Sequence, residues 1–173
     1  MNIHPILVHF PIALLSLYSI LEILQLPIIT RQSYYFFVKA TLVIVGALAT
    51  IPTLIAGDMA KEAYKGSMPQ NVIEIHATFA IIATIYFLII ALFYFVGWLR
   101  RTGFSKFTNL GTSGFWYDIV WLEKTITEGV FGIIVGLIGI ALISTVGALG
   151  GLVAYGPDND PVSALLYSII MKK

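Results

Sequence analysis

Four apolar segments, each long enough to cross a membrane as a helix, leave this chain few ways to fold. They cover residues 5–29, 34–57, 73–99 and 126–154. Crossing hydrocarbon takes about 20 helical residues, and every backbone polar group inside it must be paired within the protein. The pattern therefore predicts an all-α protein, a four-helix transmembrane bundle in contact with membrane lipid, formed as a single integral domain over residues 1–173.

Composition agrees with this fold and excludes several kinds of site. Hydrophobic residues make up 58% of the 173 residues and charged residues only 11%. The net charge of +1 gives no basis for binding nucleic acid. The chain has no cysteine, which excludes disulfides, thiolate metal sites, iron–sulfur clusters and covalently attached c-type haem.

The segment between the third and fourth spans is too long and too aromatic for a simple turn. Residues 103–125 contain Phe115, Trp116, Tyr117 and Trp121. Tryptophan and tyrosine concentrate at the boundary between membrane and water. We therefore expect an interfacial amphipathic helix between spans three and four.

Lysine and arginine set the expected orientation, because cytoplasmic loops carry an excess of both. The side that holds the loops after the first and third spans carries Arg31, Lys39, Arg100, Arg101, Lys106 and Lys124. The other side carries Lys61, Lys65, Lys172 and Lys173. The bias predicts a multi-pass protein of the cell membrane with both termini outside.

All three histidines fall on the same side of this bundle. His4 and His9 lie at the head of the first span, and His76 lies near the head of the third. Odd-numbered spans start on the same side, so His9 and His76 lie at a similar depth, roughly 5–7 Å from their helix starts. A histidine in hydrocarbon needs a partner, so each of the three is a candidate site residue.

The matched depth predicts a b-type haem held between two helices, with His9 and His76 as axial ligands. Lys61, Lys65 and Tyr64 lie in the loop on the same side and would meet its propionates. The protein would then pass electrons near the outer membrane face, with a quinol or a redox protein as its partner. It would be an electron-transfer subunit rather than a stand-alone enzyme.

Two alternatives to haem remain open. The histidines could make interhelical hydrogen bonds in a cofactor-free structural or assembly subunit. They could instead form a zinc or copper site, with the metal held by His4, His9 and His76 together with Asp58 or Glu74. The spacing disfavours this, because His4 and His9 lie about 140° apart around a helix. We expect His4 to be an interfacial polar residue.

Glycines in the fourth span form two pairs four residues apart, Gly132 with Gly136 and Gly147 with Gly151. Such pairs allow helices to approach closely. Packing within the bundle is the favoured interpretation. The alternatives are a homodimer face and a surface that makes room for a flat cofactor.

A buried charge pair is predicted far from the histidines. Glu22 is the one carboxylate expected deep within a span, and Lys39 lies at a matching depth in the next span. Ionisable residues inside membranes are usually paired and often functional. An ion pair is the favoured interpretation, and a proton path is the alternative.

Several motifs resemble a known family. They are the opening HPILVHFPIAL of residues 4–14, the Ala-Gly-Asp of residues 56–58, His76 at the head of span three, and the LGGLVAYG of residues 149–156. Together they resemble the prokaryotic four-helix membrane proteins of domain of unknown function family 2231. The similarity extends over most of residues 1–156 and departs from the family in the aromatic 103–125 segment. It implies the fold but no activity. Some family members are joined to Rieske-type redox modules, which favours electron transfer by association.

Overall fold

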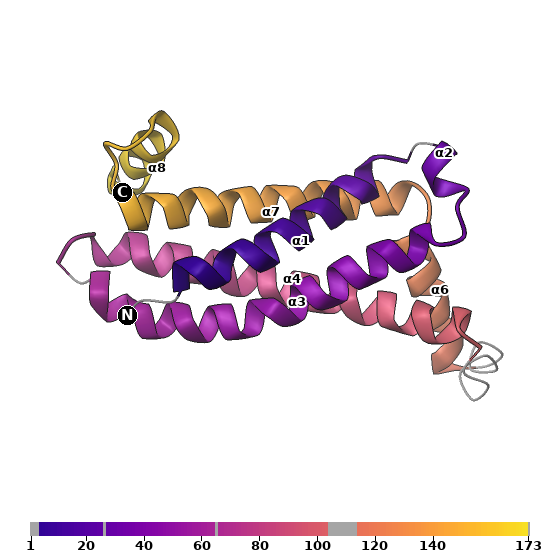
Figure 1. The fold of residues 1–173 in the computed structure, drawn as a ribbon. Helices are drawn as coiled ribbons and strands as arrows, with labels where there is room; N and C mark the ends of the chain where they lie inside the picture. Colours follow the sequence, from indigo (N-terminus) through magenta and orange to yellow (C-terminus); the bar gives the residue numbers. More distant parts are fainter. Residues whose placement is uncertain (1–3, 26, 65, 104–113, 173) are drawn as a thin grey trace.

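The computed structural model describes residues 4–25, 27–64, 66–103 and 114–172. Four long helices lie side by side in Figure 1: α1 (His4–Ile23), α3 (Tyr35–Ala60), α4 (Gln70–Arg101) and α7 (Val130–Tyr155). Each is long and apolar enough to cross a membrane. The other secondary-structure elements of the described residues are shorter helices. The predicted all-α bundle is confirmed.

Short helices lie at the two ends of the bundle (Figure 1). One end carries α2 (Pro27–Thr30) and α6 (Phe115–Thr127), and the other carries the 3₁₀ helix η1 (Lys61–Tyr64) and α8 (Pro161–Met171). We call the first the arginine end, because α4 finishes there at Arg100 and Arg101. We call the second the histidine end, because α1 and α4 begin there and carry the histidines.

The four long helices surround a common core. α1 packs against α3 and α7, and α4 packs against the same two helices, so α1 and α4 face each other diagonally. Histidines on α1 and on α4 therefore approach the interior from opposite corners. This arrangement determines which side chains can meet across the bundle.

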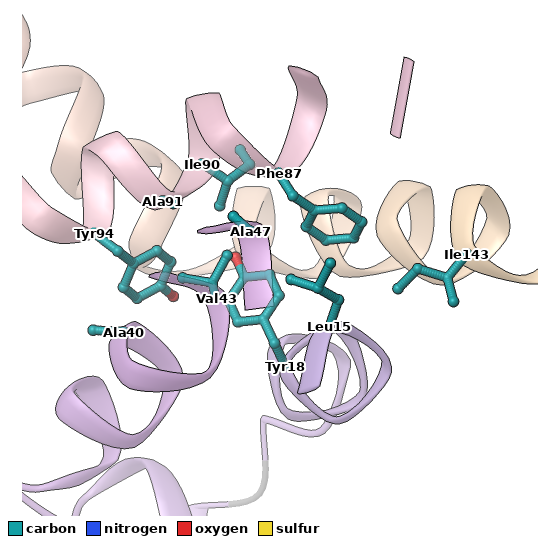
Figure 2. Close-up of a cluster of buried hydrophobic side chains, with 10 residues drawn as sticks. All are labelled: Leu15, Tyr18, Ala40, Val43, Ala47, Phe87, Ile90, Ala91, Tyr94 and Ile143. Carbon is teal, nitrogen blue, oxygen red and sulfur yellow. The ribbon is translucent and has the colours of Figure 1, made fainter. Parts of the chain in front are cut away.

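Aromatic rings join the two diagonal helices. Tyr18 of α1 and both Tyr94 and Phe87 of α4 are completely buried. The ring of Tyr18 meets that of Tyr94 edge-on at 5.5 Å between centroids and that of Phe87 at 6.4 Å, the geometry that aromatic pairs prefer. Figure 2 shows these rings with Leu15 and Val43 in one cluster.

Glycines bring α7 close to α1. A Cβ atom added to Gly136 would lie 2.7 Å from the Ser19 carbonyl oxygen, and one added to Gly139 would lie 2.5 Å from Ser19 Oγ. A Cβ at Gly132 would lie 2.9 Å from a carboxylate oxygen of Glu22. Gly132 and Gly136 therefore serve packing within the bundle, as the sequence favoured.

Two span limits differ from the predictions. The first span was expected to reach residue 29, but α1 ends at Ile23 and Pro27 starts α2. Proline disfavours the helical conformation in the residue before it and suits the first position of a helix, and Pro27 occupies the first position of α2. The fourth span was expected from residue 126, but α7 begins at Val130. Gly129 has φ of +72°, a left-handed conformation that separates α6 from α7.

The interfacial helix is α6, which packs against α4 and α7. Its side chains Phe115 and Trp121 are exposed, whereas Glu123 and Thr127 are buried against the bundle. Its aromatic side chains thus point away from the bundle and two of its polar side chains point into it, as suits a helix that lies in lipid. Of the segment predicted for this helix, residues 104–113 fall outside the described residues.

Candidate functional site

A cavity of about 700 Å³ lies between the long helices at the histidine end. We call it the histidine cavity, because His4, His9 and His76 all line it. Its volume falls within the roughly 300–1,000 Å³ typical of ligand pockets. Most of its other lining side chains are apolar, and its inner limit includes Leu15 and Phe87, near the middle of the bundle.

His4 is held against α3. Its Nδ1 lies 3.1 Å from the carbonyl oxygen of Thr53. A carbonyl can only accept, so the proton of a neutral ring is placed on Nδ1. The ring also rests on glycine, since a Cβ added to Gly57 would lie 3.0 Å from His4 Cε1. The sequence placed His4 at the interface as a polar residue, and the structure packs it between helices.

His76 is seated against α7 in a similar way. A Cβ added to Gly150 would lie 3.2 Å from His76 Cε1. Its Nδ1 is buried beside the backbone of Val146 but makes no hydrogen bond of good geometry to any described residue. His76 also interacts electrostatically with His4, so these two rings lie within reach of each other across the cavity.

His9 lines the same cavity but is exposed. The sequence predicted that His9 and His76 would form the ligand pair, and the structure brings all three histidines to one cavity. Lys61 and Tyr64 also line it, as expected for its rim. Lys61 Nζ already pairs with Asp58 at 2.7 Å. Lys65 lies outside the described residues.

The described residues contain no group of three histidine, aspartate or glutamate side chains that could hold a metal ion. The two carboxylates considered as metal ligands have other contacts. Asp58 pairs with Lys61, and Glu74 accepts a hydrogen bond from Gln70 Nε2 at 3.1 Å. The geometry thus offers no support for the zinc or copper interpretation.

Two glycines leave part of one wall of the histidine cavity without side chains. Gly147 and Gly151 of α7 line the cavity, and a Cβ added to either would have no atom within 4 Å. The two lie four residues apart and so on one face of the helix. The second glycine pair therefore differs from the first, which is packed against α1.

The predicted ion pair is confirmed at the opposite end of the core. Lys39 Nζ lies 2.9 Å from Glu22 Oε2, and both side chains are buried. Tyr94 donates a hydrogen bond to the other oxygen of Glu22. Lys39 also donates to the carbonyl of Thr127 at 3.4 Å.

Two hydroxyl groups beside this pair were missed by the sequence reasoning. Tyr18 and Ser19 are completely buried, and neither Tyr18 OH nor Ser19 Oγ makes a hydrogen bond of good geometry to any described residue. Tyr18 still interacts electrostatically with Glu22 and Tyr94. Tyr18 lies one helical turn before Glu22, and this spacing was the available signal. We call Tyr18, Ser19, Glu22, Lys39 and Tyr94 the Glu22 cluster.

A second buried carboxylate ties α6 to α4. Glu123 lies 2.7 Å from Arg101 and 3.3 Å from Arg100, and accepts a hydrogen bond from Thr127 Oγ1 at 3.3 Å. Thr127 therefore joins this group to the Glu22 cluster. The guanidinium of Arg101 also lies over the Phe36 ring, 3.7 Å from its centroid.

A smaller cavity of about 340 Å³ opens between the two charged groups. We call it the polar cavity, because Gln25, Tyr35, Lys39 and Arg101 help to line it. It lies at the arginine end, whereas the histidine cavity lies at the other. These two cavities lie at opposite ends of the bundle, and the first is mainly apolar whereas the second is lined largely by polar residues.

Comparison with known proteins agrees with this architecture. Residues 1–158 match the family described as "Predicted membrane protein (DUF2231)". Comparisons with curated proteins and with solved structures gave no match. The match covers all four long helices and the histidine cavity. The chain is therefore a multi-pass membrane protein that belongs to the DUF2231 family.

Proposed function

We propose that this protein binds haem b in the histidine cavity and passes electrons near one face of the membrane. The observation that carries the proposal is the pairing of an apolar cavity of about 700 Å³ with a buried, unsatisfied Nδ1 on His76 at its wall. A buried polar atom without a partner is costly, and such atoms in native proteins often serve a ligand or a functional role. A bound haem would supply one-electron redox chemistry.

His4 and His76 are the favoured ligands. A histidine that binds a metal usually donates its other ring N–H to a carbonyl or carboxylate, which fixes the ring orientation. His4 has this arrangement, because its Nδ1 is hydrogen-bonded to the Thr53 carbonyl. Gly57 and Gly150 allow the two rings to approach the neighbouring helices closely. The open wall at Gly147 and Gly151 leaves room for a planar group.

The remaining parts of the proposal follow from position. Lys61 and Tyr64 would meet the propionates at the rim. The lysine and arginine bias places the histidine end outside, so electrons would be exchanged there with a quinol or a redox protein. Since Gly132 and Gly136 pack against α1 of the same chain, the proposal requires no homodimer.

The test is the absorption spectrum of the purified protein, oxidised and then reduced with dithionite, together with a pyridine haemochrome assay. Protein from haem-replete cells should show a reduced α-band of b type. His76→Ala and His4→Ala should each abolish or shift this band, whereas His9→Ala should keep it. A colourless wild-type protein would exclude the haem proposal and leave a cofactor-free bundle.

Matched variants separate the loss of a ligand from the loss of the fold. A Cβ at Gly151 would meet no atom within 4 Å, so Gly151→Leu should extend into the open space of the cavity and lower haem content while thermal unfolding stays cooperative. If His9→Ala removes the band and His4→Ala does not, the ligand pair is the one predicted from the sequence. In that outcome haem remains and only the role of His4 is wrong.

A further inference from the structure

The two cavities enter the bundle from opposite ends and stop a short distance apart. The histidine cavity reaches Leu15 and Phe87. The polar cavity reaches Lys39. Along α1, Glu22 lies seven residues after Leu15, a rise of about 10 Å. Only this middle layer separates the two cavities.

The Glu22 cluster fills that layer. Glu22 contacts Lys39 toward the polar cavity and Tyr94 toward the interior. Tyr18 follows, with its ring edge-on to Tyr94 on one side and to Phe87, a wall of the histidine cavity, on the other. Figure 2 shows the hydroxyl oxygens of Tyr18 and Tyr94, drawn in red, inside the cluster of buried side chains that also contains Phe87 and Leu15.

The chemistry of this layer exceeds what packing requires. Its polar groups are a carboxylate, an ammonium and three hydroxyls, and each of them can exchange a proton. The hydroxyls of Tyr18 and Ser19 are buried and meet no partner among the described residues, although apolar side chains would fit a purely structural layer. Ionisable groups inside membrane bundles commonly mark ion or proton pathways.

We propose that the Glu22 cluster carries protons between the polar cavity and the histidine cavity. A proton that enters beside Lys39 binds the Glu22 carboxylate and forms the neutral acid. The acid then releases it along the hydroxyls of Tyr94 and Tyr18 toward the inner limit of the histidine cavity. One proton is gained and one is lost, so no oxidant or reductant is needed. The proposal does not depend on haem.

The alternative is a structural ion pair that joins α1, α3 and α4, and proton flux separates the two. Purified protein is reconstituted in liposomes that contain a pH indicator, and potassium efflux through valinomycin drives protons inward. The interior of these liposomes should acidify faster than that of protein-free liposomes. The variant Glu22→Gln/Lys39→Met keeps a neutral pair of similar size, so it avoids a lone buried charge. Its rate should fall to that of protein-free liposomes.

Two tyrosine variants supply the matched control. Tyr18→Phe keeps the ring and removes only the hydroxyl that interacts with Glu22 and Tyr94, so it should fold normally and conduct more slowly. The control Tyr86→Phe removes a tyrosine hydroxyl from α4. That hydroxyl donates to the Val135 carbonyl at 2.7 Å and lies outside the proposed path, so proton flux should persist. Wild-type flux no faster than that of protein-free liposomes would overturn the proposal. The proposal would also be overturned if Tyr18→Phe and the neutral-pair variant both kept the wild-type rate of proton flux.

Discussion

Lys39 is a cation enclosed by a membrane bundle, and its surroundings replace water with specific contacts. Its ammonium donates to Glu22 and to the Thr127 carbonyl. It also lies over two aromatic rings, 4.9 Å from the centroid of Tyr35 and 5.6 Å from that of Tyr94. Rings attract cations through their negative faces. The charge is therefore held by four helical segments together, and not by Glu22 alone.

Removal of Lys39 would leave the Glu22 carboxylate buried without its cation. Lys39→Met should destabilise the protein strongly, by about 3–5 kcal/mol, because the Glu22 carboxylate would stay buried without its cation. The neutral-pair variant Glu22→Gln/Lys39→Met should lose much less. Thermal or denaturant unfolding in detergent measures both. Equal losses in the single and double variants would show that the ion pair is not the source of the effect.

At the scale of one helix, α7 carries two glycine pairs of identical spacing with opposite roles. Gly132 and Gly136 touch α1, and Gly147 and Gly151 face the histidine cavity. The difference arises because the bundle is closed around its aromatic core and open at the histidine end. Substitutions at the two glycine pairs should therefore have different effects on stability.

Alanine scanning of α7 should show the difference. At Gly136 a Cβ would lie 2.7 Å from a backbone oxygen of α1, which cannot move without shifting the helix. Gly136→Ala should therefore cost about 1–3 kcal/mol. Gly147→Ala meets no atom within 4 Å and should be neutral or stabilising by up to about 1 kcal/mol, since alanine favours helix over glycine. Unfolding midpoints in detergent compare the pair, and equal effects would contradict the packing described here.

The helix α8 depends on a cap that titrates. Asp160 accepts hydrogen bonds from the Ser163 hydroxyl at 2.7 Å and from the amides of Ser163 and Val162. The bonds from Ser163, first from its hydroxyl and then from its amide, hold the pKa of Asp160 below its usual value. A lowered pKa means that the cap stabilises α8 above the ordinary aspartate pKa and loses this effect as the pH falls through the lowered pKa.

Amide hydrogen exchange in the first turn of α8 measures this loss. Exchange, corrected for its intrinsic pH dependence, should become less protected as the solution is acidified through that range. Asp160→Ala should show weak protection at every pH, because the amide acceptor is gone. Ser163→Ala should show an intermediate profile, because it keeps the amide bonds and removes the hydroxyl. Protection that is independent of pH in the wild type would rule out the cap as its cause.

The features that could be predicted from the sequence are those that the hydrocarbon core of the membrane requires. The four spans follow from length and apolarity, and the Glu22–Lys39 pair follows from matched depth. The break at Pro27 was overlooked because apolar residues continue past it. The packing of His4 on Gly57 could not be predicted, since it depends on how closely α3 approaches α1. The unsatisfied hydroxyls of Tyr18 and Ser19 also depend on three-dimensional packing.

At the scale of the whole molecule, the two ends of the bundle differ in chemistry. The arginine end concentrates charged side chains and aromatic rings, whereas the histidine end encloses a wide, mainly apolar space. Buried side chains are densest from Leu15 toward Tyr94. The wide apolar space at the histidine end is what the proposed binding of haem requires.

The contacts of Glu123 have a consequence for how the chain enters the membrane. Arg100 and Arg101 are the strongest pair of positive charges for setting orientation, yet in the folded protein both are paired with a carboxylate more than twenty residues later in the chain. During synthesis α4 emerges before Glu123, so the arginines are still unpaired when the helix is oriented. We therefore expect the same two side chains to act twice in succession, first as a signal that orients α4 in the membrane and then as the anchor that holds α6 on the finished bundle.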